Sequence, residues 1–187
     1  GGESRICSVE SKPVTTLRLP NTPKISGTRI KFVLLTPAIF VAVPDHNGGW
    51  LPNWVSPKDG SFRLLDGPGP DKVKRLRRKF PDIKAGAPIE ARLVSAHIGK
   101  PEIVSGWAQG KRGGAKSTLL AVPAGSVYYF EASSEEQAQK LVSALNWNSN
   151  KNSDSPSINR RSALMGEKGY GIGVCAPWQF LEDNNSK

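Results

Sequence analysis

The sequence predicts an α+β fold in which short strands outnumber helices. Runs of β-branched and aromatic residues recur along the chain between glycines and prolines, which is typical of strands. Only two segments repeat apolar residues at helical spacing. The length of 187 residues corresponds to one or two domains, and a hydrophobic content of 37% is enough to build a core.

Strands are expected where these runs occur, at residues 28–35, 39–43, 89–98, 103–107, 118–122, 127–130 and 170–178. Pro123-Ala124-Gly125-Ser126 separates two of them. Because proline presets φ and glycine accepts a positive φ, this sequence predicts a hairpin turn between 118–122 and 127–130.

The first expected helix covers residues 71–80 and is strongly basic. Pro70 suits the first turn, Val73, Leu76 and Phe80 recur at helical spacing, and Pro81 ends the pattern. The second helix follows Ser133 and Glu136, which form a capping-box pattern. Its apolar face is expected to consist of Ala138, Leu141, Val142 and Leu145.

The remaining stretches are expected to be irregular. Residues 1–27 form an extended N-terminal segment, 44–70 form a long insertion that serves as a functional loop or docking surface, and 146–162 form a mobile loop rich in Asn and Ser. The tail 182–187 is expected to fray. Because the only methionine is Met165, we expect the chain to be a fragment, a processed product or the visible part of something longer. A sheet whose partner strands lie in a preceding segment would then have unpaired edges.

The net charge of +10 and the pI of about 9.8 point to a polyanion as partner, with nucleic acid the leading class. No apolar stretch approaches the length of a membrane helix, so no membrane association is expected. Cys7 and Cys175 have neither metal-site nor disulfide-framework spacing, so a cytoplasmic location is predicted.

Two loops are candidates for phosphate binding. Residues 166–173 are rich in glycine, which lets backbone N–H groups approach a phosphate, although the same glycines also suit close packing in a strand. Residues 110–117 resemble a nucleotide-binding loop, but Ala115 replaces the second glycine and a strand-like run follows. Nucleotide hydrolysis is therefore rejected, and a basic loop beside phosphate remains.

Other candidate residues point to binding rather than catalysis. Trp50, Trp54, Trp107 and Tyr170 are candidates for stacking on unpaired bases, with packing in the core as the alternative. The basic helix suits a nucleic-acid backbone or a solvated surface equally well. The only histidines, His46 and His97, have no predicted partner, and the acidic residues are scattered, so neither a catalytic nor a metal site is expected.

Several segments, taken in chain order, resemble a known family. They are 1–5, Leu34-Leu35-Thr36-Pro37-Ala38-Ile39-Phe40, 49–52, Gly99-Lys100-Pro101, Ser105-Gly106-Trp107, 122–131 and Gly166-Glu167-Lys168-Gly169-Tyr170-Gly171-Ile172-Gly173. Together they are similar to the CRISPR RAMP proteins, and within them to the third subunit of the type III-B (Cmr) effector module. The resemblance implies a RAMP ferredoxin-like (RRM-like) antiparallel sheet over residues 28–187, as the C-terminal part of a protein with two ferredoxin-like domains.

The resemblance implies a non-catalytic, RNA-binding subunit of an antiviral ribonucleoprotein, without a cofactor. The subunit would hold the 5′ handle of the CRISPR RNA (crRNA), bridge the large polymerase-domain subunit to the backbone RAMP subunits, and meet target RNA only indirectly. The alternatives are a metal-independent RAMP endoribonuclease that processes crRNA, and a basic scaffold without specific RNA recognition.

The residue types and the family resemblance together indicate candidate residues for binding RNA and partner subunits. The RNA-binding candidates are Arg5, Lys100, Trp107, Lys111, Arg112, Lys116, Arg160, Arg161, Lys168, Gly169, Tyr170, Gly171 and Gly173. The candidates for binding partner subunits are Trp50, Trp54, Arg75 and Arg78. The amides of the three glycines are expected to contact handle phosphates, and Trp107 and Tyr170 to meet unstacked bases.

Overall fold

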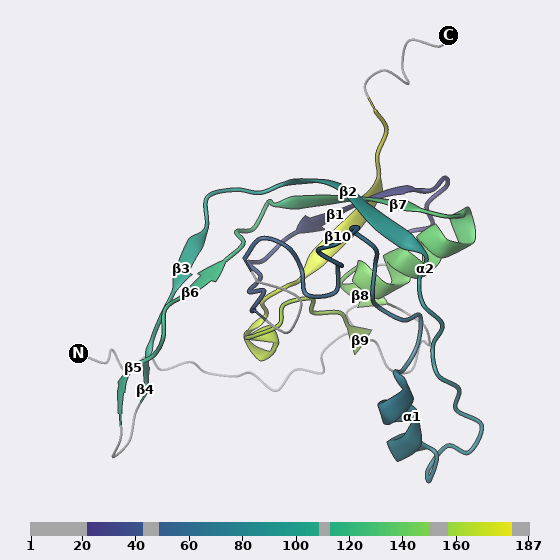
Figure 1. Cartoon of the computed structure of the whole chain (residues 1–187), viewed down its shortest axis with the longest axis horizontal. Helices are drawn as coiled ribbons and strands as arrows, with labels where there is room; N and C mark the ends of the chain where they lie inside the picture. Colours follow the sequence, from purple (N-terminus) through teal and green to yellow (C-terminus); the bar gives the residue numbers. More distant parts are fainter. Residues whose placement is uncertain (1–21, 43–48, 109–112, 150–156, 181–187) are drawn as a thin grey trace, which may run out of the picture.

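A computed structural model describes residues 22–42, 49–108, 113–149 and 157–180 (Figure 1). Its centre is a four-stranded antiparallel sheet in the order β10-β1-β7-β2. The strands are β1 (Arg29–Leu34), β2 (Ala91–His97), β7 (Val127–Ala132) and β10 (Gly173–Pro177). These strands confirm the expected β character of 28–35, 89–98, 127–130 and 170–178, each with shifted ends.

One face of the sheet carries the core. Ile30, Phe32 and Leu34 of β1 alternate with outward-facing residues, and Tyr128 and Phe130 of β7 continue the same buried face. Helix α2 (Glu135–Leu145) packs on this face through the apolar residues expected from the sequence, all of them fully buried. The α+β class is therefore confirmed, and an antiparallel sheet with a helix on one face is compatible with a ferredoxin-like fold.

The N-terminal cap of α2 differs by one residue from the expected one. The Gln137 amide donates to the Ser134 hydroxyl at 3.2 Å, so Ser134 is the cap. The Ser133 hydroxyl instead donates to the Glu90 carboxylate at 2.8 Å, which draws it away from the helix. Of the helices in the described residues, none has the length and hydropathy needed to cross a bilayer.

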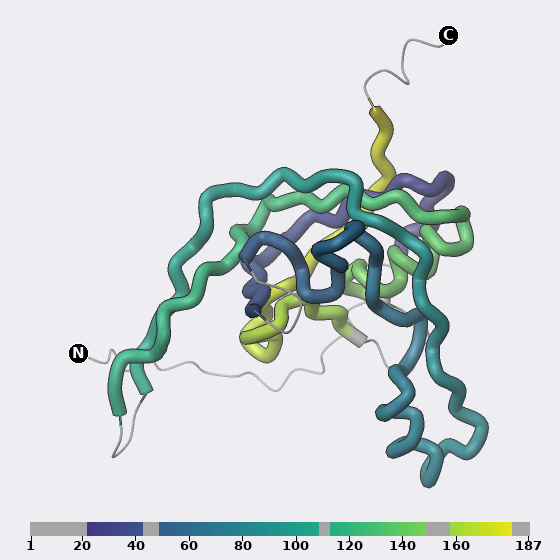
Figure 2. The backbone as a smooth tube through the Cα atoms, viewed as in Figure 1, coloured from purple at the N-terminus to yellow at the C-terminus, as the bar shows by residue number. Residues whose placement is uncertain are grey.

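A two-stranded arm extends the β2–β7 pair away from the sheet (Figure 2). The arm pairs β3 (Glu102–Val104) with β6 (Leu119–Ala121), and β4 (Trp107–Ala108) with β5 (Gly114–Ala115). The expected strand 103–107 is thus interrupted at Ser105 and Gly106. The predicted hairpin between 118–122 and 127–130 is wrong, because β6 pairs with β3, whereas β7 pairs with β1 and β2. The turn around Gly125 exists, with φ +83°, but it redirects one strand where the arm leaves the sheet.

The insertion after β1 contributes to the core instead of forming only a surface loop. Trp54 is 8% exposed and meets the rings of Phe32, Phe40, Phe62 and Phe130 at centroid distances of 5.4 to 6.4 Å. The expectation that Trp54 contacts a partner subunit is therefore wrong, because its ring fills the space between the sheet and the insertion. Residues 39–42 are not a strand either, since Phe40 makes only an isolated bridge to Gly49.

The Asn/Ser-rich segment is ordered at both ends. Asn146 and Asn148 are buried, and β8 (Asn148–Ser149) pairs with β9 (Ser157–Ile158). The Asn146 side chain accepts the Cys175 amide at 3.0 Å and thereby ties the end of α2 to β10. These ends are not irregular, because the side-chain amides of Asn146 and Asn159 bond to backbone groups there. The middle of that loop and the tail 182–187 lie outside the described residues.

A basic excursion, residues 68–85, projects from the body on the side away from the arm, and we call it the knob (Figures 1 and 2). Its helix α1 (Pro70–Leu76) is shorter than the expected 71–80. Val73 is buried, but Phe80 is 51% exposed and does not belong to the apolar face predicted for it. The chain turns after Leu76, and this turn directs Phe80 to the surface.

Candidate nucleic-acid interface

Residues 34–38 join two surface features that are far apart in the sequence. On one side, Leu34 exchanges backbone hydrogen bonds with Gly125 and Ser126 at 2.7 and 2.9 Å, and Ala38 pairs with Val122 at 2.8 and 2.9 Å. These partners form the base of the arm. On the other side lies the glycine loop, which we define as residues 165–172 and which contains the 3₁₀ turn η1 (Gly166–Lys168).

The contacts with the glycine loop come from Thr36 and its neighbours. The Thr36 hydroxyl donates to the Gly169 carbonyl at 2.7 Å and accepts the Ile172 amide at 2.9 Å. The Pro37 carbonyl accepts the Gly171 amide at 2.8 Å. The base of the arm and the glycine loop therefore flank a single five-residue stretch and form one continuous surface, the candidate interface.

Glycine is required in this loop by backbone geometry. Gly169 and Gly171 have φ values of +87° and +77°, a region that favours glycine. A Cβ on Gly171 would overlap the Ser162 nitrogen, and one on Gly173 would overlap the Phe32 ring. The close-packing alternative for these glycines thus has direct support in the contacts.

The expected phosphate cradle of backbone amides is not formed as predicted. The Gly169 amide donates to the Gly166 carbonyl at 3.0 Å, and the Gly171 amide donates to Pro37. Both donors are already used within the protein. The glycines instead fold the loop tightly and hold Lys168, which is exposed, and Tyr170, which is half-buried, at the surface.

Three candidate cations, Lys100, Arg160 and Lys168, lie on or beside this surface, and Lys116 lies farther out on the arm, beside Gly106. Lys100, Lys116, Arg160 and Lys168 are exposed, and none of them has an ion-pair partner among residues 22–42, 49–108, 113–149 and 157–180. Lys100 follows Gly99, which packs so closely on Pro123 that a Cβ there would lie 2.9 Å from the proline Cγ. Arg160 lies beside Gly166 of the glycine loop.

Arg161 has a structural role instead of the expected contact with RNA. Its guanidinium donates to the Ala144 carbonyl in the last turn of α2 and to the Asn159 side chain. Burial lowers the pKa of Arg161 to about 10, so the group stays charged at neutral pH and stabilises the negative end of the helix dipole. Its side chain is therefore not available to a phosphate.

Exposed apolar side chains line the arm. Trp107 is 68% exposed on β4, and Ile103 on β3 is 74% exposed. Of these two, the sequence singled out only Trp107. Prediction from the sequence also missed Leu35, which is exposed in the stretch that joins the arm to the glycine loop, and Thr36, which anchors that loop. A Thr-Pro pair next to a strand marks a turn, but it gave no indication of a partner 133 residues away.

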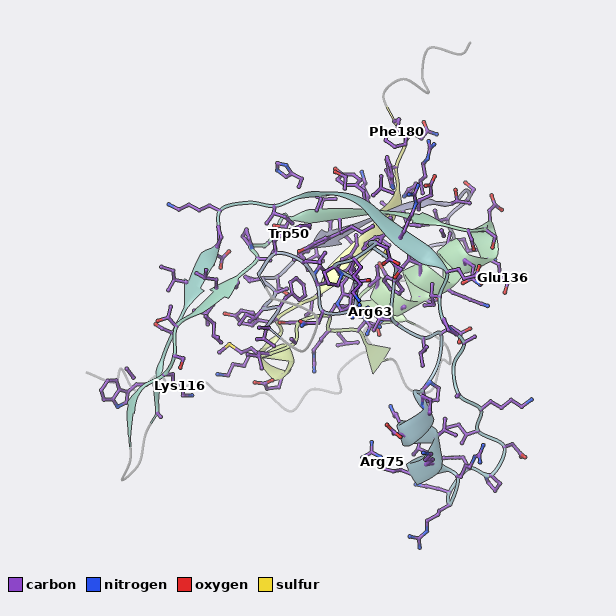
Figure 3. The ribbon with its side chains drawn as sticks, in the orientation of Figure 1. Trp50, Arg63, Arg75, Lys116, Glu136 and Phe180 are labelled. Atoms are coloured by element: carbon purple, nitrogen blue, oxygen red, sulfur yellow. The ribbon has the colours of Figure 1, made fainter. Side chains whose placement is uncertain are left out.

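The other candidates lie elsewhere. Arg5, Lys111 and Arg112 lie outside the described residues, as does His46. Arg75 and Arg78 are exposed on the knob. Trp50 is half-exposed, and its carbonyl accepts the Tyr128 hydroxyl at 2.6 Å. Figure 3 shows Lys116 on the arm and Arg75 on the knob, on opposite sides of the body.

The described residues bring together no group of three His, Cys, Asp or Glu side chains that could hold a metal ion. His97 is exposed at the end of β2, where it pairs with Val127 at the start of the arm. Cys175 is buried, and burial raises the pKa of its thiol, which keeps the thiol protonated and unreactive.

A scan against protein families found one whose description is CRISPR-associated protein (Cas_Cmr3), and its model matches residues 1–178. A search of curated proteins found no match. The family match covers the arm, the glycine loop and the knob together.

Proposed function

The chain belongs to the Cas_Cmr3 family of CRISPR-associated proteins, a family of effector subunits, and on that premise we propose that it binds the 5′ handle of crRNA at the candidate interface. Cations on the arm and the glycine loop hold the handle phosphates. Trp107 and Tyr170 stack on unpaired handle bases, as aromatic side chains do with single-stranded RNA.

The observation that carries this proposal is the convergence of separate sequence segments on one surface. Residues 34–38, the base of the arm and the glycine loop come from three parts of the chain and are joined by direct hydrogen bonds. Around them lie cations whose charge is not offset by any described acidic partner, which is the electrostatic pattern of a phosphate-binding surface.

We also propose that the subunit bridges the large polymerase-domain subunit and the backbone RAMP subunits of a cytoplasmic effector complex, with Trp50 as one contact. A half-exposed tryptophan is a frequent anchor of protein interfaces, because its large ring buries much area with little loss of entropy. At the candidate interface, target RNA would then be met only through the guide.

The subunit is proposed to be non-catalytic. In support, general acid–base cleavage of RNA needs a second titratable group next to the histidine. His97 lies at the surface of β2, and its strand partner, Val127, is apolar and cannot act as an acid or a base.

The proposal predicts the RNA that accompanies the protein. When the complex that contains this chain is purified under native conditions and its RNA is sequenced from both ends, the molecules should share one fixed 5′ segment followed by variable sequence. A complex with His97→Ala should contain RNA of the same length and 5′ end.

Two other outcomes would contradict the proposal. RNA of random sequence, or no RNA, would favour a basic scaffold. Unprocessed, longer RNA in the His97→Ala complex would favour the endoribonuclease.

A further inference from the structure

The knob carries much of the chain's positive charge, and little of this charge is paired within the fold. Its 18 residues contain seven Lys or Arg and two Asp, so their net charge of 7 − 2 = +5 is half of the +10 of the whole chain. All seven cations are exposed. The one ion pair recorded within the described knob, Lys74–Asp71 at 3.8 Å, joins two side chains that are mostly in solvent.

The knob is nevertheless held in a defined position. Gly67 and Gly86 form the neck, where the knob joins the body. They approach so closely that a Cβ on Gly86 would overlap the Gly67 backbone. Asp66 accepts the Ala87 amide at 2.7 Å and lies 3.6 Å from Lys140 of α2, which ties the neck to the body. A fixed projection that buries only Val73 completely and concentrates like charges contributes little to folding.

Its surface chemistry suits a single-stranded nucleic acid. Arg75, Arg77 and Arg78 offer planar guanidinium groups, which match phosphate geometry better than lysine does. Phe80 follows them two residues after Arg78 and is 51% exposed, with the Lys79 ammonium 5.8 Å from its ring centre. Cations next to an exposed aromatic ring are the combination that holds unpaired strands, through phosphate contacts and base stacking.

We propose that the knob is a second nucleic-acid site, for a single strand other than the crRNA handle. It lies on the opposite side of the body from the arm (Figure 3). An acidic protein surface would suit the arginines, but it would give no role to the exposed Phe80 ring in the same segment. The inference stands on the knob's own residues and does not depend on the proposed function.

The test uses the complex loaded with its guide and a labelled oligouridine of roughly 16 nucleotides, the upper end of a common binding-site size. The knob triple carries Arg75→Gln, Arg77→Gln and Arg78→Gln. If each arginine contacts one phosphate, the salt slope of log K should fall by about 2, because each contact to a single strand contributes roughly 0.7. At about 0.1 M salt this corresponds to roughly 100-fold weaker binding. Phe80→Ala should weaken binding roughly tenfold with an unchanged slope.

A control triple, Lys24→Gln, Lys58→Gln and Arg63→Gln, removes the same charge from exposed positions on the body and should leave binding unchanged. If both triples lose the same affinity for oligouridine, net charge alone explains the effect and the proposal is overturned. Unchanged oligouridine binding by the knob triple would also overturn it, and loss of another subunit in that variant would identify an acidic protein as the partner. Guide content, measured in the same samples, reports on the handle site separately and should not change in the knob triple.

Discussion

Removing three cations from the arm and the glycine loop should strongly weaken retention of the guide. The interface triple carries Lys100→Gln, Lys116→Gln and Lys168→Gln, and leaves Arg160, which packs beside Gly166, in place. Three lost phosphate contacts should lower the salt slope by about 2 and the affinity for a synthetic handle roughly 100-fold at about 0.1 M salt. Titration of the reconstituted complex at several salt concentrations measures both quantities.

The control and knob triples make this prediction specific. Each removes three charges, but from the body or from the opposite projection, so handle affinity should stay within about twofold of the unmodified complex. If the interface triple retains the handle as well as the control triple does, Lys100, Lys116 and Lys168 do not contact it. All three lysines are exposed and outside the core, so this variant should fold as the parent chain does.

Trp54→Ala is expected to cause the largest loss of stability among single substitutions at the predicted sites. Its ring packs against Phe62 at 5.4 Å and Phe130 at 6.0 Å, and its indole N–H donates to the Arg161 carbonyl at 3.2 Å. Truncating a buried tryptophan costs about 3–5 kcal/mol, and for a chain of this size that lowers the melting temperature by roughly 10 °C. Thermal unfolding of the purified subunit followed by circular dichroism measures the shift.

Trp50→Ala is the matched comparison, because Trp50 is half-exposed and its hydrogen bond to Tyr128 uses the backbone carbonyl. This variant should unfold within about 1 kcal/mol of the parent chain. Equal stability of the two variants would mean that Trp54 does not fill the core and that its predicted role at a subunit contact should be restored.

The strands of the central sheet were predictable because their signal is local. Residues 28–35 and 127–130 have β-branched and aromatic residues between turn formers, and both became strands that bury alternate side chains. The apolar face of α2 was predictable for the same reason, since the spacing of its apolar residues follows the helical period of 3.6 residues.

Pairing partners and burial required information that no local pattern contains. The hairpin at 123–126 looked favourable by turn chemistry, but β6 follows the register of the arm and pairs with β3. Trp54 and Arg161 have sequence neighbours typical of loops, yet four aromatic rings surround the former and the last turn of α2 holds the latter. Each outcome depends on contacts between residues far apart in the chain.

The candidate site was predictable in its residue types and less so in its mechanism. Lys100, Lys116 and Lys168 are exposed on the arm and the glycine loop, as phosphate contacts require. The amides of Gly169 and Gly171 are bonded within the protein, because the loop that brings them to the surface uses them to fold. A glycine-rich sequence alone does not distinguish a loop whose amides are available to a ligand from one whose amides form hydrogen bonds within the protein.

Photocrosslinking tests the handle site most directly. The complex is assembled with a guide that carries thiouridine only within its 5′ handle, irradiated, and digested, and the crosslinked peptides of this chain are identified by mass spectrometry. Crosslinks in peptides that contain Lys100, Trp107 or Tyr170 are the predicted result. Crosslinks confined to the knob, or to other subunits with none on this chain, would contradict the assignment of the handle to the arm and the glycine loop.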